Sequence, residues 1–314
     1  MEKVVVAQKM STAVVERLKP YCEVVFCKEG DVEDLKRVLH DAVAVILGTW
    51  VEFSAELIDA SPRLKVISRT GAGVDNVDVS YASEKGILVL NTPYENRVSV
   101  AEHTVAMICA LSKQILFLDT KVRCGDFNAR RLYLPVDMDG KTLGLLGCGG
   151  IAREVANKCT HAFNMKAIAY DPYLDIPPDN IEMYSDIEDI FRQADYLSIH
   201  IPYTPGAKGL VGAHLLSLMK STSFLVNTAR GGIVDECALY DALKSKTIAG
   251  AALDVFETEP LEAENKLAQL GNILLTPHTA ALTKECSLRV ATCAAQGVLD
   301  YLQGDVPRFV YNNK

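Results

Sequence analysis

The sequence feature that most constrains the fold is a glycine-rich turn between an apolar strand and a helix. The run KTLGLLG (141–147) has the character of a buried strand, and the segment GCGGIA (147–152) follows it in the pattern G-x-G-x-x-A. The next strand ends at Asp171, 24 residues after Gly147. Such a turn lets a pyrophosphate approach backbone N–H groups at a helix N-terminus, and the acid accepts hydrogen bonds from the ribose hydroxyls. The pattern predicts an NAD site rather than an NADP site, involving Gly147, Gly149, Gly150, Ile151 and Asp171.

A glycine cluster alone could simply turn the chain, with Asp171 capping a loop. The ordered series of strand, glycines, helix, strand and acid favours nucleotide binding, because it supplies the structural context that the motif needs. Cys148 lies inside the turn, and no base accompanies it. We interpret it as a small filler where a bulky side chain would block the phosphate.

Apolar runs of strand length alternate with segments of helical period along the whole chain. The first series comprises 4–7, 23–26, 42–47, 64–69 and 87–91, and the second comprises 141–147, 167–171, 196–202, 223–229, 250–256 and 272–278. This alternation is typical of parallel sheets covered by helices, and continuous apolar strands are buried on both faces. We therefore predict an α/β protein with two doubly wound parallel-sheet domains.

Two long amphipathic segments lie outside the strands, at 99–122 and 284–304. If the second one returns to pack on the first unit, the second unit is an insertion. The predicted catalytic (substrate) domain is then 1–98 with 284–314, and the predicted NAD-binding Rossmann domain is 99–283. The host domain is expected to be flavodoxin-like.

Composition excludes several classes of protein. The 314 residues include 40 acids and 32 Lys or Arg, which gives −8, and no basic run is dense enough for nucleic acid. No window reaches the roughly 18 uncharged apolar residues of a membrane span, and the start of the chain lacks the pattern of a signal peptide. The nine cysteines form no CxxC pair, which favours neither a disulfide framework nor a metal site. We expect a cytoplasmic protein with no metal, no nucleic-acid partner and no membrane partner.

Three polar segments follow predicted strands at the edge where open α/β sheets bind ligands: 227–243, 250–260 and 276–281. These segments contain three candidate catalytic residues, Arg230, Glu259 and His278. A histidine suits the transfer of a hydroxyl proton, a carboxylate would orient it, and a guanidinium would grip a substrate carboxylate. Each residue alone could be a solvated loop residue. We interpret the other histidines as structural, and place His103 at the domain boundary.

Several longer motifs resemble the D-isomer-specific 2-hydroxyacid dehydrogenases: RTGAGVDNVDV (69–79), YDP (170–172), NTARGGIVDE (227–236), ALDVFETEP (252–260) and PH (277–278). The resemblance implies that Arg230, Glu259 and His278 are catalytic, that Asp254 lies near the nicotinamide carboxamide, and that Ala72 and Gly73 offer amides to the substrate carboxylate. It also implies a homodimer or homotetramer built on the coenzyme domain. The remaining candidates are Ile201, Thr228, Ala229 and His278 for the cofactor, and Arg69 and Arg230 for the substrate.

The sequence departs from this family at two places in the cofactor turn and one near the substrate. Ala152 stands where relatives often have glycine, and Gly150 replaces a common arginine, which removes one side-chain contact to the pyrophosphate. Relatives that oxidise 3-phosphoglycerate tend to carry an arginine after the strand at 42–47, and here Gly48, Thr49 and Trp50 carry no charge.

We therefore expect a small unphosphorylated 2-hydroxy acid or 2-oxoacid, similar to hydroxypyruvate or glyoxylate. D-3-phosphoglycerate stays as the alternative, because Arg69, Arg130 and Arg131 could supply positive charge. Because the sequence ends near Lys314, we expect no appended regulatory domain of the kind that longer phosphoglycerate dehydrogenases carry. A hypothesis of another class is an NAD-sensing binding module without turnover. A formate-type oxidiser is disfavoured because such relatives usually have an amide where Glu259 stands.

Overall fold

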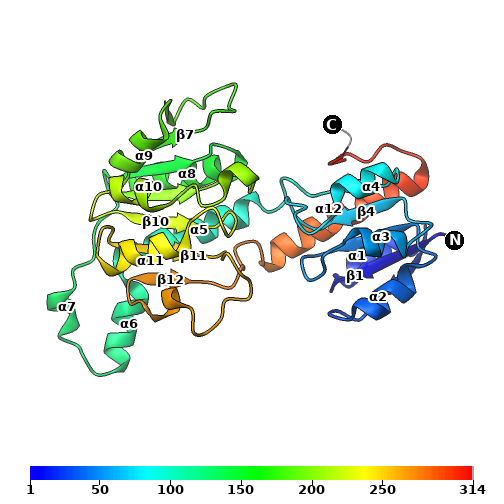
Figure 1. Ribbon diagram of the computed structural model, residues 1–314, viewed down its shortest axis with the longest axis horizontal. Helices are drawn as coiled ribbons and strands as arrows, with labels where there is room; N and C mark the ends of the chain where they lie inside the picture. The colour runs from blue at the N-terminus through cyan, green and yellow to red at the C-terminus, as the bar shows by residue number, and fades with distance from the viewer. Residues whose placement is uncertain (313–314) are drawn as a thin grey trace. The chain divides into compact units, whose positions relative to one another are not determined.

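The structure is a computed structural model that describes residues 1–312, and the chain divides into two compact units (Figure 1). Unit 1 comprises Met1–Asn96 and the chain from Leu282 onward, and unit 2 comprises Arg97–Ala281. Each division lies two residues before the predicted one. The last two residues of the predicted range 284–314 lie outside the described residues.

Unit 1 is a five-stranded parallel sheet in the order β2-β1-β3-β4-β5. Its elements are β1 (Lys3–Ala7), α1 (Thr12–Leu18), β2 (Glu23–Phe26), α2 (Val32–Leu39), β3 (Ala44–Leu47), α3 (Ala55–Asp59), β4 (Val66–Arg69), α4 (Val79–Glu84), β5 (Leu88–Leu90) and α12 (Lys284–Gln303). This strand order is that of flavodoxin-like folds. The central strands β1 and β3 are apolar almost throughout because both of their faces are buried.

Helix α12 belongs to unit 1, although it follows unit 2 in the chain. Its first turn is capped by Thr283, whose side chain accepts a hydrogen bond from Cys286 N. The helix ends at Gln303, and Gly304 caps it with a φ of 83°. Small residues such as Ala294 and Ala295 let the helix pack closely on β4 and β3 and on α1. This return of the chain confirms that the second domain is inserted into the first.

Unit 2 is a seven-stranded parallel sheet in the order β12-β11-β10-β9-β6-β7-β8. Its elements are α5 (Arg97–Lys113), α6 (Ile115–Arg123), α7 (Ala129–Leu132), β6 (Thr142–Leu146), α8 (Gly150–Phe163), β7 (Lys166–Tyr170), β8 (Glu182–Tyr184), α9 (Ile187–Gln193), β9 (Tyr196–Ile199), η1 (Pro205–Ala207), α10 (Ala213–Leu218), β10 (Phe224–Asn227), α11 (Glu236–Lys244), β11 (Gly250–Leu253), η2 (Lys266–Gln269) and β12 (Ile273–Leu275). Counted from β6, this is the doubly wound Rossmann order with one added strand. The order reverses between β6 and β9, and dinucleotides bind at such a switch point.

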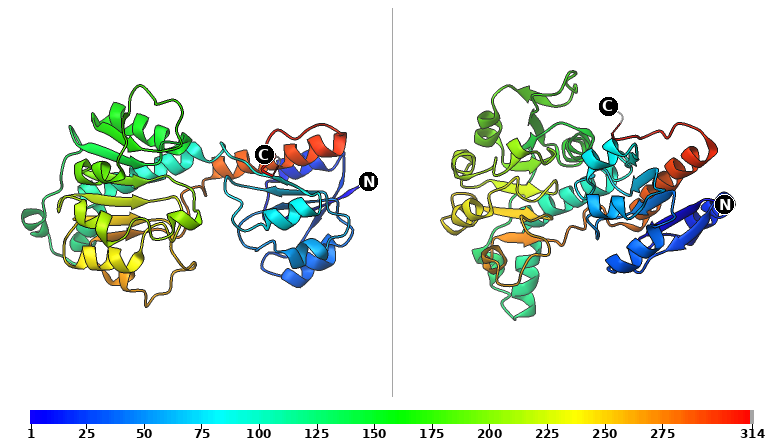
Figure 2. Two further views of the ribbon diagram at one scale, coloured as in Figure 1. Left: turned by 45° about the horizontal axis from the view of Figure 1, so that its top comes forward. Right: turned by 45° about the vertical axis from the view of Figure 1, so that its right-hand side comes forward.

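Helices cover both faces of this sheet (Figure 2). One core cluster includes Ile190 and Phe191 of α9 with Leu239 of α11, and the other includes Ile108 of α5 with Val155 of α8. The strands between them carry few polar side chains, as expected for a sheet buried on both faces. No helix within residues 1–312 is both long enough and apolar enough to cross a membrane.

The amphipathic segment 99–122 is divided between two helices. Helix α5 ends at Lys113, and Gln114 adopts a left-handed conformation with a φ of 50°, after which α6 begins in a new direction. The chain returns at Val136, where Ser112 accepts a backbone hydrogen bond from Val136 N and donates one to Val136 O. We call residues 113–136 the arm. A helical period cannot reveal this break, because both helices have it.

Candidate active site

The glycine turn between β6 and α8 has the geometry of a dinucleotide cradle. Gly147 has a φ of 91°, and a Cβ on it would lie 2.8 Å from the backbone oxygen of His200, so a side chain is excluded. Beside Gly149, nothing lies within 4 Å of the place of a Cβ. The 14-residue helix α8 begins at Gly150 and points its free N–H groups at this open space. The residues present therefore fit the pyrophosphate of a dinucleotide.

Asp171 follows β7 and is tied directly to the glycine turn. Its Oδ2 accepts a hydrogen bond from Cys148 N at 2.9 Å, and its Oδ1 accepts one from Tyr173 N at 3.0 Å. These bonds fix the carboxylate beside the cradle, while the side chain stays partly exposed. A carboxylate held there can receive ribose hydroxyls and would repel a 2′-phosphate.

The end of β9 closes the other side of the cradle. The side chain of Ile201 lies 2.9 Å from where a Cβ on Gly147 would be, so this predicted cofactor residue lies against the turn. Its neighbour His200 is a neutral group, because burial lowers its pKa to about 3, and its ring bonds the Ser198 hydroxyl at 2.8 Å. Burial also raises the pKa of the Cys148 thiol, which makes this cysteine a poor nucleophile.

His278 and Glu259 form the closest acid–base pair of the site. His278 Nδ1 lies 2.7 Å from Glu259 Oε2, and Glu259 Oε1 accepts a hydrogen bond from Phe256 N at 3.0 Å. The carboxylate is thus anchored to its own loop while it orients the ring. The side chains are 45% and 35% exposed, which leaves the ring accessible to a substrate.

Asp254 organises the loop that carries His278. It follows β11 and is fully buried. Its carboxylate accepts hydrogen bonds from Thr276 Oγ1 at 2.5 Å, Thr279 N at 2.8 Å and Ala280 N at 2.9 Å. Its backbone oxygen accepts a bond from His278 N at 2.8 Å. These four contacts hold His278 in a left-handed conformation with a φ of 52°, which few side chains adopt.

Arg230 lies on the turn after β10, and this turn touches the loop of Glu259. Asn227 accepts from Ala229 N and donates to the backbone oxygen of Arg230, which fixes the turn. Gly231 presses against the next loop so closely that a Cβ on it would lie 1.7 Å from Phe256 O. The structure therefore places the Arg230 and Glu259 loops in direct contact, and His278 pairs with Glu259.

Helix α5 reaches both loops, which the sequence did not indicate. His103 Nε2 lies 3.1 Å from Thr276 Oγ1, and Thr104 Oγ1 lies 2.8 Å from the Oγ1 of Thr228, the predicted cofactor residue next to Ala229. His103 and Thr276 were not among the candidate site residues. A signal was present, since Thr276 directly precedes the Pro-His motif, but nothing in the sequence pairs a helix residue with it.

The substrate candidates Arg69, Ala72 and Gly73 lie in unit 1, at the end of β4 and in the turn after it. Asn91 Nδ2 donates to Ala72 O at 2.7 Å, which holds the backbone of this turn. The guanidinium of Arg69 folds back over Gly71, so closely that a Cβ on Gly71 would meet it at 1.4 Å. These three residues belong to unit 1, whereas the other predicted site residues belong to unit 2.

The comparison with protein families matches residues 105–280 to the model described as "D-isomer specific 2-hydroxyacid dehydrogenase, NAD binding domain". This range contains the glycine turn, Asp171, Arg230, Glu259 and His278. The chain belongs to the D-isomer specific 2-hydroxyacid dehydrogenase family. Membership in this family confirms the predicted NAD cofactor and the family resemblance of the sequence motifs.

Similar proteins and solved structures match nearly the whole chain. The D-3-phosphoglycerate dehydrogenase of Methanocaldococcus jannaschii is 35% identical over 99% of this chain, which spans 60% of that relative's length. The TT0316 protein of Thermus thermophilus has a TM-score of 0.91 at 32% identity, over 98% of this chain and 99% of its own. A glyoxylate reductase of Paecilomyes thermophila has a TM-score of 0.90 at 28% identity, and the match covers 100% of this chain and 99% of that one. These structures confirm the predicted fold class.

Proposed function

We propose that the chain is an NAD-dependent dehydrogenase in which His278 moves the proton of a D-2-hydroxy acid. The observation that carries this proposal is the 2.7 Å pair of His278 and Glu259, on a loop in contact with that of Arg230 and in the same unit as the dinucleotide cradle. Bound NAD would supply the hydride acceptor at C4 of its nicotinamide. The protein's own residues supply the proton acceptor and the binding groups.

The contact with Glu259 decides which nitrogen of His278 acts. A carboxylate has no proton to donate, so the hydrogen in this contact belongs to Nδ1. The free lone pair of the neutral ring is then on Nε2, which takes the hydroxyl proton during oxidation and returns it during reduction. Glu259 stabilises the positive charge that the ring acquires. Arg230 would bind the substrate carboxylate and polarise the carbonyl. In unit 1, the amides of Ala72 and Gly73 are the groups that would bind a carboxylate.

We propose D-3-phosphoglycerate as the preferred substrate, which reverses the order expected from the sequence. Support comes from the relative of that name, which matches 99% of this chain. The uncharged Gly48, Thr49 and Trp50 favour a second candidate, a hydroxypyruvate or glyoxylate reductase, and the glyoxylate reductase neighbour agrees with it. Trp50 in particular packs on the core of unit 1 and donates its indole N–H to Ala7 O.

A substrate panel tests this proposal. NADH consumption is measured with 3-phosphohydroxypyruvate, hydroxypyruvate, glyoxylate and pyruvate, and we expect the first to have a kcat/KM at least about tenfold above the others. A higher value for hydroxypyruvate or glyoxylate would assign the unphosphorylated branch instead. If no 2-oxoacid is reduced while NADH still binds, the chain is a binding module and the dehydrogenase proposal is wrong.

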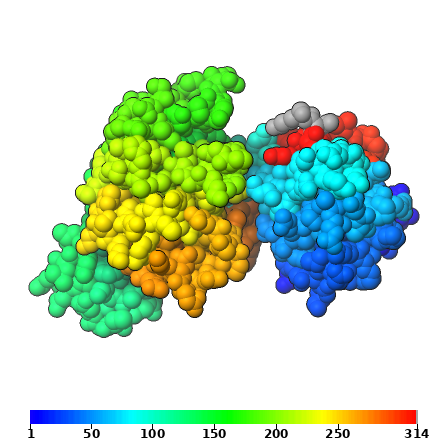
Figure 3. All heavy atoms as spheres, in the orientation of Figure 1, coloured from blue at the N-terminus to red at the C-terminus, as the bar shows by residue number. Residues whose placement is uncertain are grey.

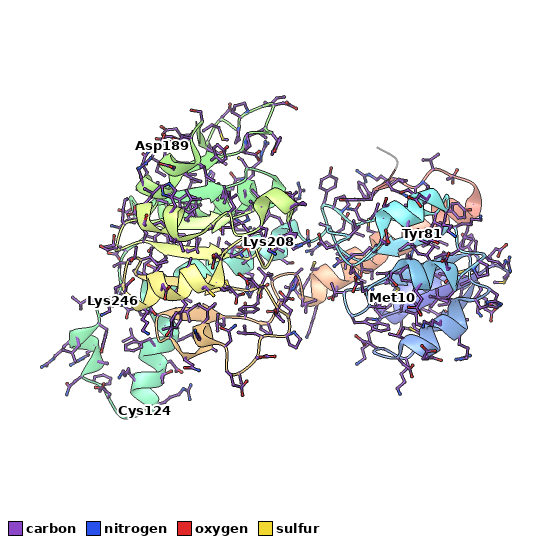
Figure 4. All side chains as sticks on the ribbon, viewed as in Figure 1. Met10, Tyr81, Cys124, Asp189, Lys208 and Lys246 are labelled. Carbon is purple, nitrogen blue, oxygen red and sulfur yellow. The ribbon has the colours of Figure 1, made fainter. Side chains whose placement is uncertain are left out.

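We also propose that two copies of the chain associate through the arm. Helix α6 buries no residue within the unit, and the arm stands out from the rest of unit 2 (Figure 3), with Cys124 at the end of α6 (Figure 4). Its exposed large apolar side chains are Ile115, Leu116, Val122, Phe127, Leu132, Tyr133, Leu134 and Val136. So many exposed apolar groups on one segment are unusual for a monomer, and a second copy would cover them symmetrically.

The variant Leu132→Glu with Leu134→Glu, which places two charges on the arm, tests this association. We expect light scattering after size exclusion to report twice the 34.3 kDa chain mass for the unaltered protein and 34.3 kDa for the variant. Val306→Glu, at an equally exposed apolar residue of unit 1, should leave the mass unchanged. An unaltered protein that runs as a monomer at micromolar concentration would contradict the proposal.

A further inference from the structure

The carboxylate of Asp254 is buried and contacts only a small set of polar groups among the described residues. Its side chain is 1% exposed, and among the described residues its one ion-pair partner is His103, with Nε2 of the ring 3.6 Å from Oδ1. Burying a carboxylate is costly unless hydrogen bonds compensate it. Here the compensation comes from Thr276, Thr279 and Ala280, which belong to the loop that carries His278. The orientation of Asp254 and the position of His278 are therefore coupled.

The hydroxyl of Thr276 fixes the direction of hydrogen bonding in this cluster. A hydroxyl has one hydrogen, and the acceptor-only carboxylate of Asp254, 2.5 Å away, takes it. The 3.1 Å contact between Thr276 Oγ1 and His103 Nε2 then needs its hydrogen from the imidazole. His103 Nε2 is thus the donor, Thr276 relays the bond, and Asp254 receives it.

Helix α5 is well packed and holds the backbone of His103 in place. The next residue, Thr104, donates to Val100 O and contacts Thr228 Oγ1 on the turn that carries Arg230. The helix itself packs on α8 and on strands β10 and β11. Two consecutive residues of one packed helix therefore contact the loops of Arg230 and His278.

We propose that His103 is a positioning residue of the dehydrogenase: by donating to Thr276, it holds Asp254 and the 276–280 loop in the geometry that aims His278. This inference rests on the proposed function for its kinetic consequence. It assigns to α5 a role beyond packing on the sheet and on α8, because removal of the donor leaves the Thr276 hydroxyl held by its bond to Asp254 alone. The loop would then sample other conformations, while the His278–Glu259 pair would keep its chemistry.

Two variants of His103 separate the effect of its hydrogen-bond donor from the effect of its side-chain volume. His103→Leu removes the donor at similar volume, and His103→Gln retains an N–H in place of Nε2. We expect kcat for 2-oxoacid reduction to fall about tenfold in the leucine variant and to return to within about threefold in the glutamine variant, with KM nearly unchanged. Thr276→Val should match His103→Leu, and the double variant should be no slower than either single one, because both remove the same relay.

Hydrogen–deuterium exchange gives a readout that does not need turnover. The amides of Thr279 and Ala280 donate to Asp254, so we expect them to exchange several-fold faster in His103→Leu and Thr276→Val, and at the original rate in His103→Gln. Ala106→Gln, on the exposed face of α5, is the control and should change neither exchange nor kcat. Unchanged exchange in His103→Leu, additive losses in the double variant, or a glutamine variant as impaired as leucine would each overturn the proposal. If exchange responds while no 2-oxoacid is reduced, the proposed function fails and the positioning contact stands.

Discussion

Replacement of His278 by asparagine is expected to lower kcat for 2-oxoacid reduction by about 10²- to 10⁴-fold, the usual contribution of a positioned general acid or base. The ring is the group that Glu259 orients at 2.7 Å. Another histidine of unit 2, His214, contacts Glu188 at 2.8 Å, but these two residues lie on helices α10 and α9 instead of on the loops that follow the strands. NADH affinity, measured by fluorescence titration, should change little, because the glycine turn and Asp171 are untouched. Steady-state NADH consumption gives the kcat.

Asparagine is chosen because of the backbone of His278. With a φ of 52°, this position is left-handed, and asparagine tolerates that conformation better than alanine does. We therefore expect His278→Ala to lose similar activity and to melt at a lower temperature than His278→Asn. His40→Asn, an exposed position in unit 1, is the control and should retain full activity. Near-normal turnover in His278→Asn would remove His278 from the mechanism.

Local patterns predicted much of this molecule because the residues concerned are adjacent in the chain. The glycine turn, the strand before it and the acid after β7 lie within 31 residues, 141–171, so the order of elements alone brought Gly147 and Asp171 together. The buried parallel strands are visible as apolar runs such as AVIL in β3, because both faces need apolar side chains.

Tertiary contacts between distant residues could not be predicted in the same way. His103 and Thr276 are 173 positions apart, and their contact depends on α5 packing across the sheet of unit 2. The break at Gln114 is another example, because a glutamine in a left-handed conformation has no signal in a hydrophobic period. The apolar residues of the arm look like core residues in the sequence, and only the structure shows that the unit does not bury them.

Substrate preference depended on too few residues to be predicted from the sequence. The uncharged stretch at 48–50 indicated an unphosphorylated acid, whereas a relative that matches nearly all of the chain is named a phosphoglycerate dehydrogenase. The absence of one arginine is weak evidence, because a phosphate can be bound by charges from other elements. We propose Arg69, at the end of β4 and beside the turn of Ala72, as one such charge.

Replacement of Gly231 by alanine is expected to reduce kcat/KM by about 100-fold or more, although the change adds a single methyl group. Its Cβ would lie 1.7 Å from Phe256 O and 2.2 Å from the carbonyl carbon, and both are backbone atoms that cannot rotate away. Relief requires the turn of Arg230 and the loop of Glu259 to separate. Since Phe256 N also anchors Glu259, the change would displace two of the proposed catalytic side chains, Arg230 and Glu259, at once.

The control for the melting temperature and the kinetics of Gly231→Ala is the same substitution at a glycine that has room for a methyl group. Gly271, in the turn before β12 of the same unit, has no atom within 4 Å of the place of its Cβ, so Gly271→Ala should keep both the melting temperature and kcat/KM. In Gly231→Ala we expect a lower melting temperature as well as the kinetic loss, because the strained contact weakens the packing of the loop at Phe256. A variant that is destabilised but reduces 2-oxoacids at the original rate would show that the contact between these two loops supports the fold without setting the geometry of catalysis.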